Sequence, residues 1–270
     1  MEQTSPPRGT QALDRGLALL MAIVASRGQT SLTKIASDLG LAISTAHRLV
    51  ARLEETGMVI RTGRGRYRAG LQFAHLAAHI DIREAVALAG RPILKSLARE
   101  TGRTAHLGLL DQDMVTYLVK EAPPRQDMFT RETMQLEAYC SAVGKVLLAQ
   151  LPEAEREAYL TNGPFIELTP NTIIDPDRLR QHLAGVRKDQ FAFDDNEIEV
   201  GLFCIAVPVH TGTQQLSLAM SSSGANLPEP EAAALLQRLR EISVILSQRL
   251  GARDLPPPAA SDERSPQAVH

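Results

Sequence analysis

The chain has 270 residues, a formal net charge of -2 at pH 7, 44% hydrophobic residues and two cysteines. At roughly 100–200 residues per domain, this length predicts two domains. Cys140 and Cys204 form no CxxC pair, which excludes a disulfide scaffold or zinc ribbon and indicates a reducing compartment. No apolar run approaches the ~18 residues of a membrane helix, and residues 1–10 lack a signal-peptide core, so we expect a cytoplasmic protein without membrane contact.

The charge is distributed unevenly along the chain. Residues 1–70 contain ten Lys and Arg against five Asp and Glu, whereas residues 71–270 contain 19 against 26. A basic N-terminal module on an acidic body indicates that the small module binds a polyanion. A chance excess of solvated arginines would explain the charge difference equally well.

The periodicity of residues 10–70 predicts a compact helical module that ends in a hairpin. Residues 1–9, with Pro6, Pro7 and Gly9, are expected to be a loose tail. The predicted helices span 13–24, 33–39 and 43–55, with a turn at Gly40 between the last two, and the predicted strands span 58–61 and 67–69.

The predicted helix 43–55 has two chemically distinct faces. One carries Ile43, Ala46, Leu49, Val50 and Leu53, and the other is polar and basic. A helix that enters a DNA major groove needs a buried anchor face and donors for base edges and phosphates. An ordinary amphipathic surface helix would leave the preceding short helix and the following hairpin unexplained. The candidate DNA-binding residues are Ser44, Thr45, His47, Arg48 and Arg52.

The hairpin that follows is rich in arginine. Its sequence RTGRGRYR places Arg61, Arg64, Arg66 and Arg68 around two glycines, which suits contact with a phosphate backbone or insertion into a minor groove. Arg64 and Arg66 are therefore predicted to contact DNA. No strand–GxGxxG–helix context surrounds the glycines, so this is not a nucleotide-binding loop.

Beyond residue 70 the pattern predicts an α+β domain, a mixed sheet with helices on its faces and no cofactor signature. A linker helix at 71–89 ends at Gly90, and Arg91-Pro92 opens the next helix. Strands at 104–110 and 114–121 form a hairpin around Asp111-Gln112-Asp113, followed by helices at 141–150, 153–160 and 177–188, strands at 202–209 and 215–222, and a helix at 229–250. The domain boundaries that follow are a tail at 1–9, a DNA-binding module at 10–70, a linker helix at 71–89, a second domain at 90–251 and a disordered tail at 252–270.

Single residues also allow other interpretations. His75 and His79 have the spacing of a metal-ligand pair, although a packing face is favoured, so no metal is predicted. Cys140 or Cys204 could be the nucleophile of an enzyme with His106, His182 or His210 as its base, yet none lies in a nucleophile motif. Gly144-Lys145 lacks the frame of a phosphate-binding loop. A nucleic-acid binder without sequence preference also stays open.

Several motifs in order resemble the IclR (isocitrate lyase regulator) family of transcription factors. SLTKIASDLGLAISTAHRLVARLEETGMV followed by GRYRAG is similar to the winged helix-turn-helix of the family. RTAHLGLLDQDMVTYLVK, CSAVGKVLLAQLP, LTPNTIIDPDRL and, most specifically, DDNEIEVGLFCIAVPV are similar to motifs of its ligand domain. Two departures are mild: Ser141 stands where Thr is common, and Met58 where an aromatic residue is frequent.

The resemblance implies a ligand-responsive regulator rather than an enzyme. It implies an N-terminal winged helix-turn-helix domain, a linker helix and a C-terminal GAF-like effector-binding domain, with operator DNA, an effector and further copies of the chain, as dimers or dimers of dimers, as its partners. No cofactor is expected. A small organic acid, of the hydroxy-, oxo- or aromatic monocarboxylic kind, is the expected effector, because a helix N-terminus and serine hydroxyls suit a carboxylate whereas an ionised Asp repels a second one. The positions that match the family's effector site are Met128, Leu136, Ala142, Val143, Asp194, Cys204, Ser221 and Ser223.

Overall fold

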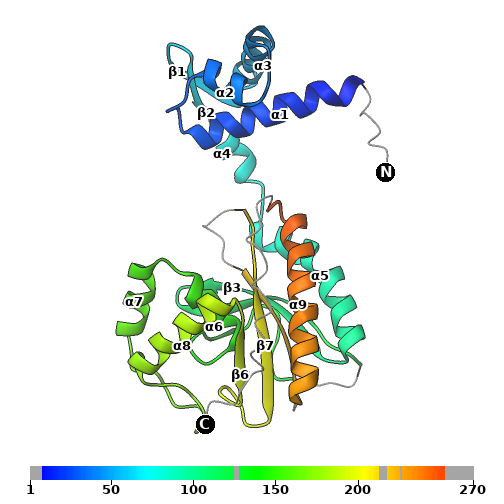
Figure 1. Cartoon of the computed structure of the whole chain (residues 1–270), viewed down its shortest axis with the longest axis vertical. Helices are drawn as coiled ribbons and strands as arrows, with labels where there is room; N and C mark the ends of the chain where they lie inside the picture. Colours follow the sequence, from blue (N-terminus) through cyan, green and yellow to red (C-terminus); the bar gives the residue numbers. More distant parts are fainter. Residues whose placement is uncertain (1–7, 125–127, 213–217, 226, 253–270) are drawn as a thin grey trace. The chain divides into compact units, whose positions relative to one another are not determined.

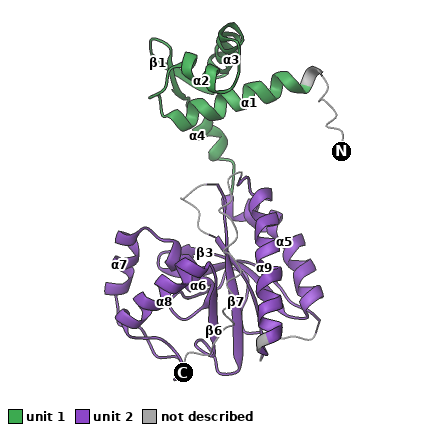
Figure 2. Ribbon diagram, in the orientation of Figure 1, with its two compact units in different colours: residues 1–81 green, residues 82–270 purple. Residues whose placement is uncertain are grey.

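The computed structural model describes residues 8–124, 128–212, 218–225 and 227–252. The chain forms two compact units, residues 1–81 and 82–270 (Figure 2). Residues 1–7 and 253–270, most of the two predicted tails, lie outside the described residues. The inner ends of those tails are ordered: Arg8 and Gly9 are helical, and Ala252 is buried with its N–H donated to Ser247 O at 3.0 Å.

Unit 1 is a three-helix core followed by a hairpin. Its buried side chains, among them Leu19, Ile23, Ile35 and Val50, come from all three helices, as the apolar periodicity of the sequence predicts. Ile43, expected on the buried face, is instead 42% exposed because it is the first residue of its helix. The elements are α1 (Arg8–Ser26), α2 (Leu32–Asp38), α3 (Ile43–Glu55), β1 (Val59–Gly63), β2 (Arg66–Ala69) and α4 (Gln72–Ala77) (Figure 1).

The turn between α2 and α3 is a Schellman motif. Gly40 has a left-handed φ of 63°, which a glycine adopts without steric cost. Gly40 N–H donates to Ser37 O at 3.1 Å, and Leu41 N–H donates to Ala36 O at 2.8 Å. The Ser31 hydroxyl caps the other end of α2 by accepting from Lys34 N. These bonds fix the angle at which α3 leaves α2.

The linker predicted as one helix over 71–89 is two helices instead. The α4 helix ends at Ala77, and α5 (Ile82–Thr101) runs through Gly90 and Pro92 without a break. Burial of Val86, Leu94, Leu97 and Ala98 outweighs the hydrogen bond that Pro92 cannot donate. Gly90 serves close packing rather than termination, since a Cβ there would lie 2.7 Å from Leu107 Cδ2.

Among its described residues, unit 2 is a six-stranded sheet of order β5-β4-β3-β8-β7-β6 with helices on both faces. Every neighbouring pair is antiparallel, so the mixed sheet expected from the sequence is wrong. The turn at Gln112-Asp113, both with positive φ, joins β3 and β4 as predicted. The strands are β3 (Thr104–Asp111), β4 (Met114–Glu121), β5 (Gln135–Glu137), β6 (Ala192–Asp195), β7 (Leu202–Val209) and β8 (Leu218–Ala225).

The two faces of this sheet have different helices and different chemistry. α5 and α9 (Glu229–Arg249) lie side by side on one face, and α6 (Ala142–Gln150), α7 (Glu153–Thr161) and α8 (Pro176–Asp189) lie on the other (Figure 1). Alternate residues of β7 divide between them: Ile205 and Val207 pack toward α5 and α9, and Cys204 and Ala206 toward α6. The α6 face also carries buried polar side chains.

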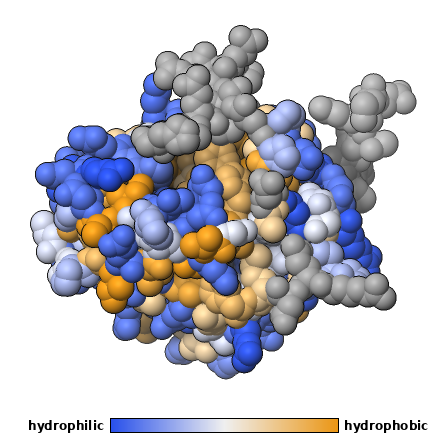
Figure 3. All heavy atoms as spheres, turned by 90° about the horizontal axis from the view of Figure 1, so that it is seen from below, coloured by the Kyte–Doolittle hydropathy of each residue, from blue (hydrophilic) through white to orange (hydrophobic). Residues whose placement is uncertain are grey.

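Large hydrophobic side chains remain on the surface of unit 2. Ile166, Leu168, Ile174 and Val200 are exposed there, and Figure 3 shows hydrophobic side chains interspersed with hydrophilic ones on the face seen from below. Across the described ranges, no helix is both long and apolar enough to span a membrane.

Candidate functional site

The exposed face of α3 carries the polar residues singled out in the sequence. Ala46 and Val50 are buried against α1 and α2, whereas Ser44, His47, Arg48 and Arg52 are exposed and Thr45 is half-buried. Arg52 forms an ion pair with Glu55 one turn later on the same helix. The helix therefore presents hydroxyl, imidazole and guanidinium donors to solvent on one side only.

The arginines of the hairpin have different surroundings. Arg64 and Arg66 are exposed at its tip, where Gly65 has a φ of 68° and its carbonyl accepts from Leu32 N at 2.8 Å. Arg68, grouped with them in the sequence, instead covers Gly28, since a Cβ there would lie 2.7 Å from Arg68 Cγ. Its Nε donates to Arg27 O at 3.0 Å, so this arginine ties the hairpin to the end of α1.

Unit 2 contains a cavity between the sheet and the start of α6. All eight positions expected to form the effector site line it. Its volume is about 10 Å³, room for the centre of about one water molecule. The lining residues are Met128, Leu136, Ala142, Val143, Asp194, Cys204, Ser221 and Ser223, together with His106, Tyr117, Phe129, Thr130, Ser141, Ile198 and Leu202.

Strand register explains why residues so distant in the sequence meet. Asp194 pairs with Cys204, and Cys204 pairs with Ser223, which puts three cavity residues in one row across β6, β7 and β8. In the next row on the same face, Ser221 of β8 pairs with His106 of β3. These two rows draw on four neighbouring strands, and Tyr117 of β4 and Leu136 of β5 extend the lining to the other two.

The start of α6 forms the opposite wall. Ser141 is the N-cap, and its hydroxyl accepts from Gly144 N at 3.0 Å. Ala142 and Val143 occupy the first turn, where backbone N–H groups have no partner within the helix. Gly144 lets the helix approach the chain before it, because a Cβ there would lie 2.1 Å from Ala138 O. The Gly144-Lys145 pair is thus a packing feature with no phosphate-loop frame.

Asp194 is the buried carboxylate of the cavity. Its Oδ1 accepts from Glu197 N at 2.8 Å and from Ile198 N at 3.4 Å, while Oδ2 has no hydrogen-bond partner among the described residues. Burial raises the pKa of Asp194 to about 6, although the backbone N–H bonds oppose this rise. One carboxyl oxygen of a cavity-lining residue is therefore without a hydrogen-bond partner among the described residues.

A buried ion pair lies behind Asp194. Lys145 of α6 is fully buried and pairs with Glu197 Oε1, and its Nζ also donates to Phe193 O at 3.2 Å. Burial raises the pKa of Glu197 to about 7, against the attraction of the Lys145 ammonium. The pair joins α6 to the turn that follows β6.

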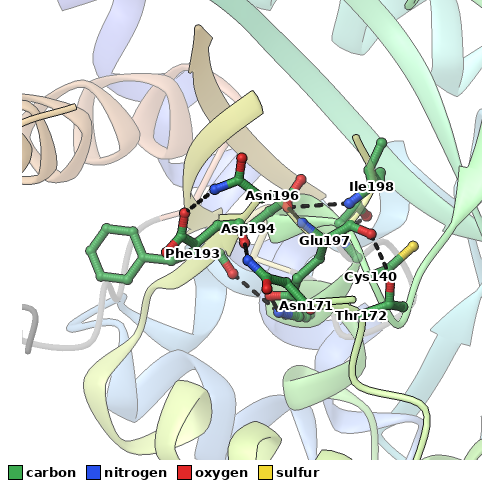
Figure 4. Close-up of polar contacts among 12 residues, drawn as sticks. Cys140, Asn171, Thr172, Phe193, Asp194, Asn196, Glu197 and Ile198 are labelled. Carbon is green, nitrogen blue, oxygen red and sulfur yellow. Dashed lines mark hydrogen bonds and ion pairs between the residues drawn. The ribbon is translucent and has the colours of Figure 1, made fainter. Parts of the chain in front are cut away.

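A second loop holds this turn by its backbone. Figure 4 shows Asn171 and Thr172 directed at residues 193–198. Three short side chains of this loop, Thr169, Asn171 and Thr172, donate to backbone carbonyls of the turn, and none of the three lines the cavity. Thr169 Oγ1 donates to Asn196 O at 2.6 Å, Asn171 Nδ2 to Asp195 O at 3.0 Å and Thr172 Oγ1 to Glu197 O at 2.7 Å.

Sequence reasoning missed seven of the cavity residues. Tyr117, Ser141, Ile198 and Leu202 lie within the motifs that resemble those of the ligand domain, whereas Phe129 and Thr130 carry no signal in the sequence. His106 had been considered solely as a base for an enzyme, yet its strand position opposite Ser221 could have been found once β3 and β8 were paired.

The surroundings of the cysteines and of the histidine pair oppose the other interpretations. Burial raises the pKa of both Cys140 and Cys204, so neither thiol is activated as a nucleophile. Beyond the end of α4, His79 Nδ1 lies 2.8 Å from His75 O, so the two histidines are linked through the backbone of His75. Within the described ranges, no group of three or more His, Cys, Asp and Glu is placed to hold a metal ion.

Comparison with known families identifies both units. Residues 12–63 match the IclR helix-turn-helix domain, and residues 74–248 match the C-terminal domain of the bacterial transcriptional regulator IclR. The chain belongs to the IclR family. It is a DNA-binding transcriptional regulator with an N-terminal helix-turn-helix domain and a C-terminal α+β domain, and its relatives are regulators rather than enzymes.

Relatives match nearly the whole chain. The transcriptional regulator XynR of Escherichia coli is 31% identical over 89% of this chain and 97% of its own length, and the transcriptional repressor IclR of the same species is 32% identical over 82% of each chain. The IclR structure from Thermotoga maritima is 29% identical, with a TM-score of 0.59 over 90% of this chain and 99% of its own. An IclR homologue from Microbacterium hydrocarbonoxydans, complexed with 4-hydroxybenzoate, shares the fold at 24% identity, with a TM-score of 0.57 over 88% of this chain and 98% of its own.

Proposed function

We propose that this IclR-family regulator binds its operator as a homo-oligomer, and that a small monocarboxylic acid in the unit 2 cavity changes its affinity for that DNA. The observation that carries the proposal is the convergence of eight expected residues, with the unpartnered Asp194 Oδ2, on one cavity. Since its target is DNA, the cytoplasm is its proposed compartment.

The DNA-contacting residues are proposed to be those of the exposed α3 face and the hairpin tip. Ser44, Thr45, His47, Arg48 and Arg52 would face the major groove, where arginine can bond guanine O6 and N7 together. Arg64 and Arg66 would contact phosphates, which adds affinity but little sequence preference. Arg52 would have to exchange its ion pair with Glu55 for a DNA contact, so Arg48 is the stronger candidate for reading a base.

A homo-oligomer is proposed because one short α3 contacts too few base pairs for useful specificity, whereas a two-fold dimer reads two half-sites. Residues 71–88 support this: Leu71, Leu76, Ile80 and Leu88 are large apolar side chains that are 45% to 77% exposed in the single chain. Burial against a second copy would remove them from water. Sedimentation of the wild type should give a dimer or tetramer; a monomer that still binds its operator specifically would contradict this.

The chemistry of the cavity supports a carboxylate ligand. The N–H groups of Ala142 and Val143 and the hydroxyls of Ser221 and Ser223 can share one negative charge as neutral donors. Asp194 Oδ2 would accept from a hydroxyl, and a second carboxylate beside it would be repelled. Met128 and Leu136 would supply apolar walls.

Ligand binding has to enlarge this cavity. A volume of about 10 Å³ cannot hold an organic acid, so some lining residues must shift when one enters. On the sheet side, β3 connects the cavity to the first helix of unit 2, because Leu107, next to His106, packs against Gly90 of α5. A ligand that favours one arrangement of β3 and α5 would shift the population of DNA-binding states by its difference in affinity for them.

The experiment is a fluorescence anisotropy titration of labelled DNA from upstream of the protein's own gene. A panel of acetate, glycolate, pyruvate, benzoate and 4-hydroxybenzoate is added to the wild type and to Ser221→Ala/Ser223→Ala. At least one acid should change the affinity of the wild type by about 5- to 150-fold and that of the double variant far less. An acid that acts equally on both proteins would mean that the effector binds elsewhere.

A further inference from the structure

His106 is a buried histidine whose second ring nitrogen is unused. The residue is 1% exposed, its ring lies 4.6 Å from that of Tyr117, and its Nε2 lies 2.9 Å from Thr130 Oγ1. Its Nδ1 has no hydrogen-bond partner among the described residues, although the residue lines the cavity beside Ser221. A buried polar atom without a partner is costly to a fold, so a partner supplied by a ligand is a natural explanation.

The charges around His106 determine which nitrogen carries the proton. Burial first, and then the Lys120 ammonium, lower the pKa of His106 to about 3, so the ring is neutral. Lys120 Nζ donates to Thr130 O at 2.5 Å and to Met128 O at 2.8 Å, which places its positive charge on the Nε2 side of the ring. A positive charge favours the lone pair on the nearer nitrogen. This charge favours the tautomer in which Nε2 accepts from the Thr130 hydroxyl and Nδ1 carries the hydrogen.

Resting on the proposed effector pocket, we propose that His106 is a specificity-determining residue whose Nδ1–H donates to the carboxylate of the effector. His106 on β3 and Asp194 on β6 are then the two polar ends of the site, the first a donor and the second an acceptor. The effector that satisfies both is a monocarboxylic acid with a hydroxyl group at its far end.

Sheet geometry sets the length of this acid. β3 and β6 are separated by β8 and β7, so their backbones lie three strand spacings or about 14 Å apart along the sheet. Side chains that converge on one cavity shorten this span, but an acid of two or three carbon atoms cannot reach both ends. A para-substituted aromatic ring or a chain of comparable length can.

The tautomer is tested first, without any ligand. Two-bond ¹H–¹⁵N NMR spectra of protein labelled with ¹⁵N-histidine should assign the proton of His106 to Nδ1 and leave it unchanged down to pH 5. A proton on Nε2, or a ring that becomes charged above pH 5, would overturn the role of His106 while leaving the proposed function standing.

Calorimetry then compares matched acids and variants on the full chain. Wild type should bind 4-hydroxybenzoate at least 10-fold more tightly than benzoate, which lacks the hydroxyl, or glycolate, which is too short. His106→Phe should lose at least 10-fold in affinity for 4-hydroxybenzoate, whereas His106→Asn, whose amide nitrogen can replace Nδ1, should stay within about 3-fold of wild type.

His182→Phe is the control for the loss of a half-buried imidazole outside the cavity. His182 lies on α8, its Nε2 is also without a partner among the described residues, and it does not line the cavity, so its affinity for 4-hydroxybenzoate should not change. Equal losses in His106→Phe and His106→Asn, or no loss in either, would overturn the proposal. Binding of none of the acids to wild type would instead refute the proposed function itself.

Discussion

Lys145 on α6 and Glu197 in the turn after β6 form an ion pair inside the effector domain, with the lysine fully buried and the Glu197 side chain 8% exposed. The pair lies behind Asp194, whose Oδ1 accepts from the backbone N–H of Glu197. The Lys145 side chain therefore joins the α6 wall of the cavity to β6 and to the turn after it, through Phe193 O and the Glu197 carboxylate. Its loss should affect both.

Removal of Lys145 should destabilise the effector domain severely. Lys145→Met leaves the Glu197 carboxylate buried without its cation, which typically costs about 3–5 kcal/mol. Because the chain has no tryptophan, the change in unfolding free energy is measured by urea unfolding followed by circular dichroism. The double variant Lys145→Met/Glu197→Met should recover most of the loss, and Lys34→Met, which breaks the exposed pair with Asp38, should cost less than about 1 kcal/mol. Equal losses of unfolding free energy in Lys145→Met and Lys34→Met would contradict the importance of the buried pair.

Two glycines in helices should respond in opposite directions to alanine. Gly144→Ala would place a Cβ 2.1 Å from a backbone oxygen, so it should destabilise the domain by more than ~2 kcal/mol. Gly185 lies in α8 with nothing within 4 Å of its Cβ position and is exposed, so Gly185→Ala should stabilise by roughly 0.5–1 kcal/mol. Thermal unfolding of both variants checks the signs. A neutral Gly144→Ala would refute the close contact of α6 with Ala138.

The stability of the effector domain should depend on pH through Asp194. Because its folded pKa is raised from 3.8 to about 6, the native state binds the proton more tightly than the unfolded chain does. This stabilisation is complete below pH 3.8 and is lost as the pH rises through 6. The difference in unfolding free energy between Asp194→Asn and wild type should therefore shift in favour of the variant by ~2 kcal/mol between pH 4 and 8.

Asp195→Asn is the control for this pH series, because Asp195 is the exposed neighbour on the same strand. Urea unfolding at pH 4, 6 and 8 supplies the data. A constant difference between Asp194→Asn and wild type would mean that the carboxyl is not held in a costly buried state.

The two groups of arginines in the DNA-binding domain should differ in their signatures. Arg48→Ala should weaken operator binding by ~1–3 kcal/mol and relax the preference at one base pair. Arg64→Ala and Arg66→Ala should each weaken binding to all sequences and lower the salt slope by about one. Anisotropy titrations over a salt series separate the two, with Arg178→Ala, an exposed arginine on α8, as the control. Unchanged footprints for Arg48→Ala/Arg52→Ala would rule out α3 as the reading helix.

Sequence periodicity predicted the elements whose apolar residues repeat over several turns or strands. The α3 helix and the β7 strand have the predicted bounds, since α3 carries one apolar face at helical spacing and β7 is a continuous apolar run that is buried on both faces of the sheet. β5 and β6 were missed because three or four residues carry too little periodicity. The predictions that a helix ends at Gly90 and that the next begins at Arg91-Pro92 are wrong, because local signals cannot report the packing of α5 against Leu107.

The candidate site likewise contains residues that the sequence could predict and residues that it could not. Ser221, Ser223, Asp194 and Cys204 could be proposed from motifs that resemble those of a family. His106 could not, because its proximity to them depends on β3 and β8 being neighbours although more than a hundred residues separate them. Arg68 illustrates the reverse error, since its resemblance to the other hairpin arginines hides its contact with Arg27 and Gly28.

The central claim is that the cavity and the DNA-binding domain are thermodynamically coupled. The most direct test is a calorimetric titration of an acid that binds the wild type but not Ser221→Ala/Ser223→Ala, performed on the protein alone and on the protein–operator complex. Coupling is reciprocal, so the ratio of the two acid affinities should equal the ratio of the operator affinities measured with and without the acid, with a coupling free energy of ~1–3 kcal/mol. An acid that binds the cavity with the same affinity in both states, while Ser221→Ala/Ser223→Ala abolishes that binding, would contradict the account.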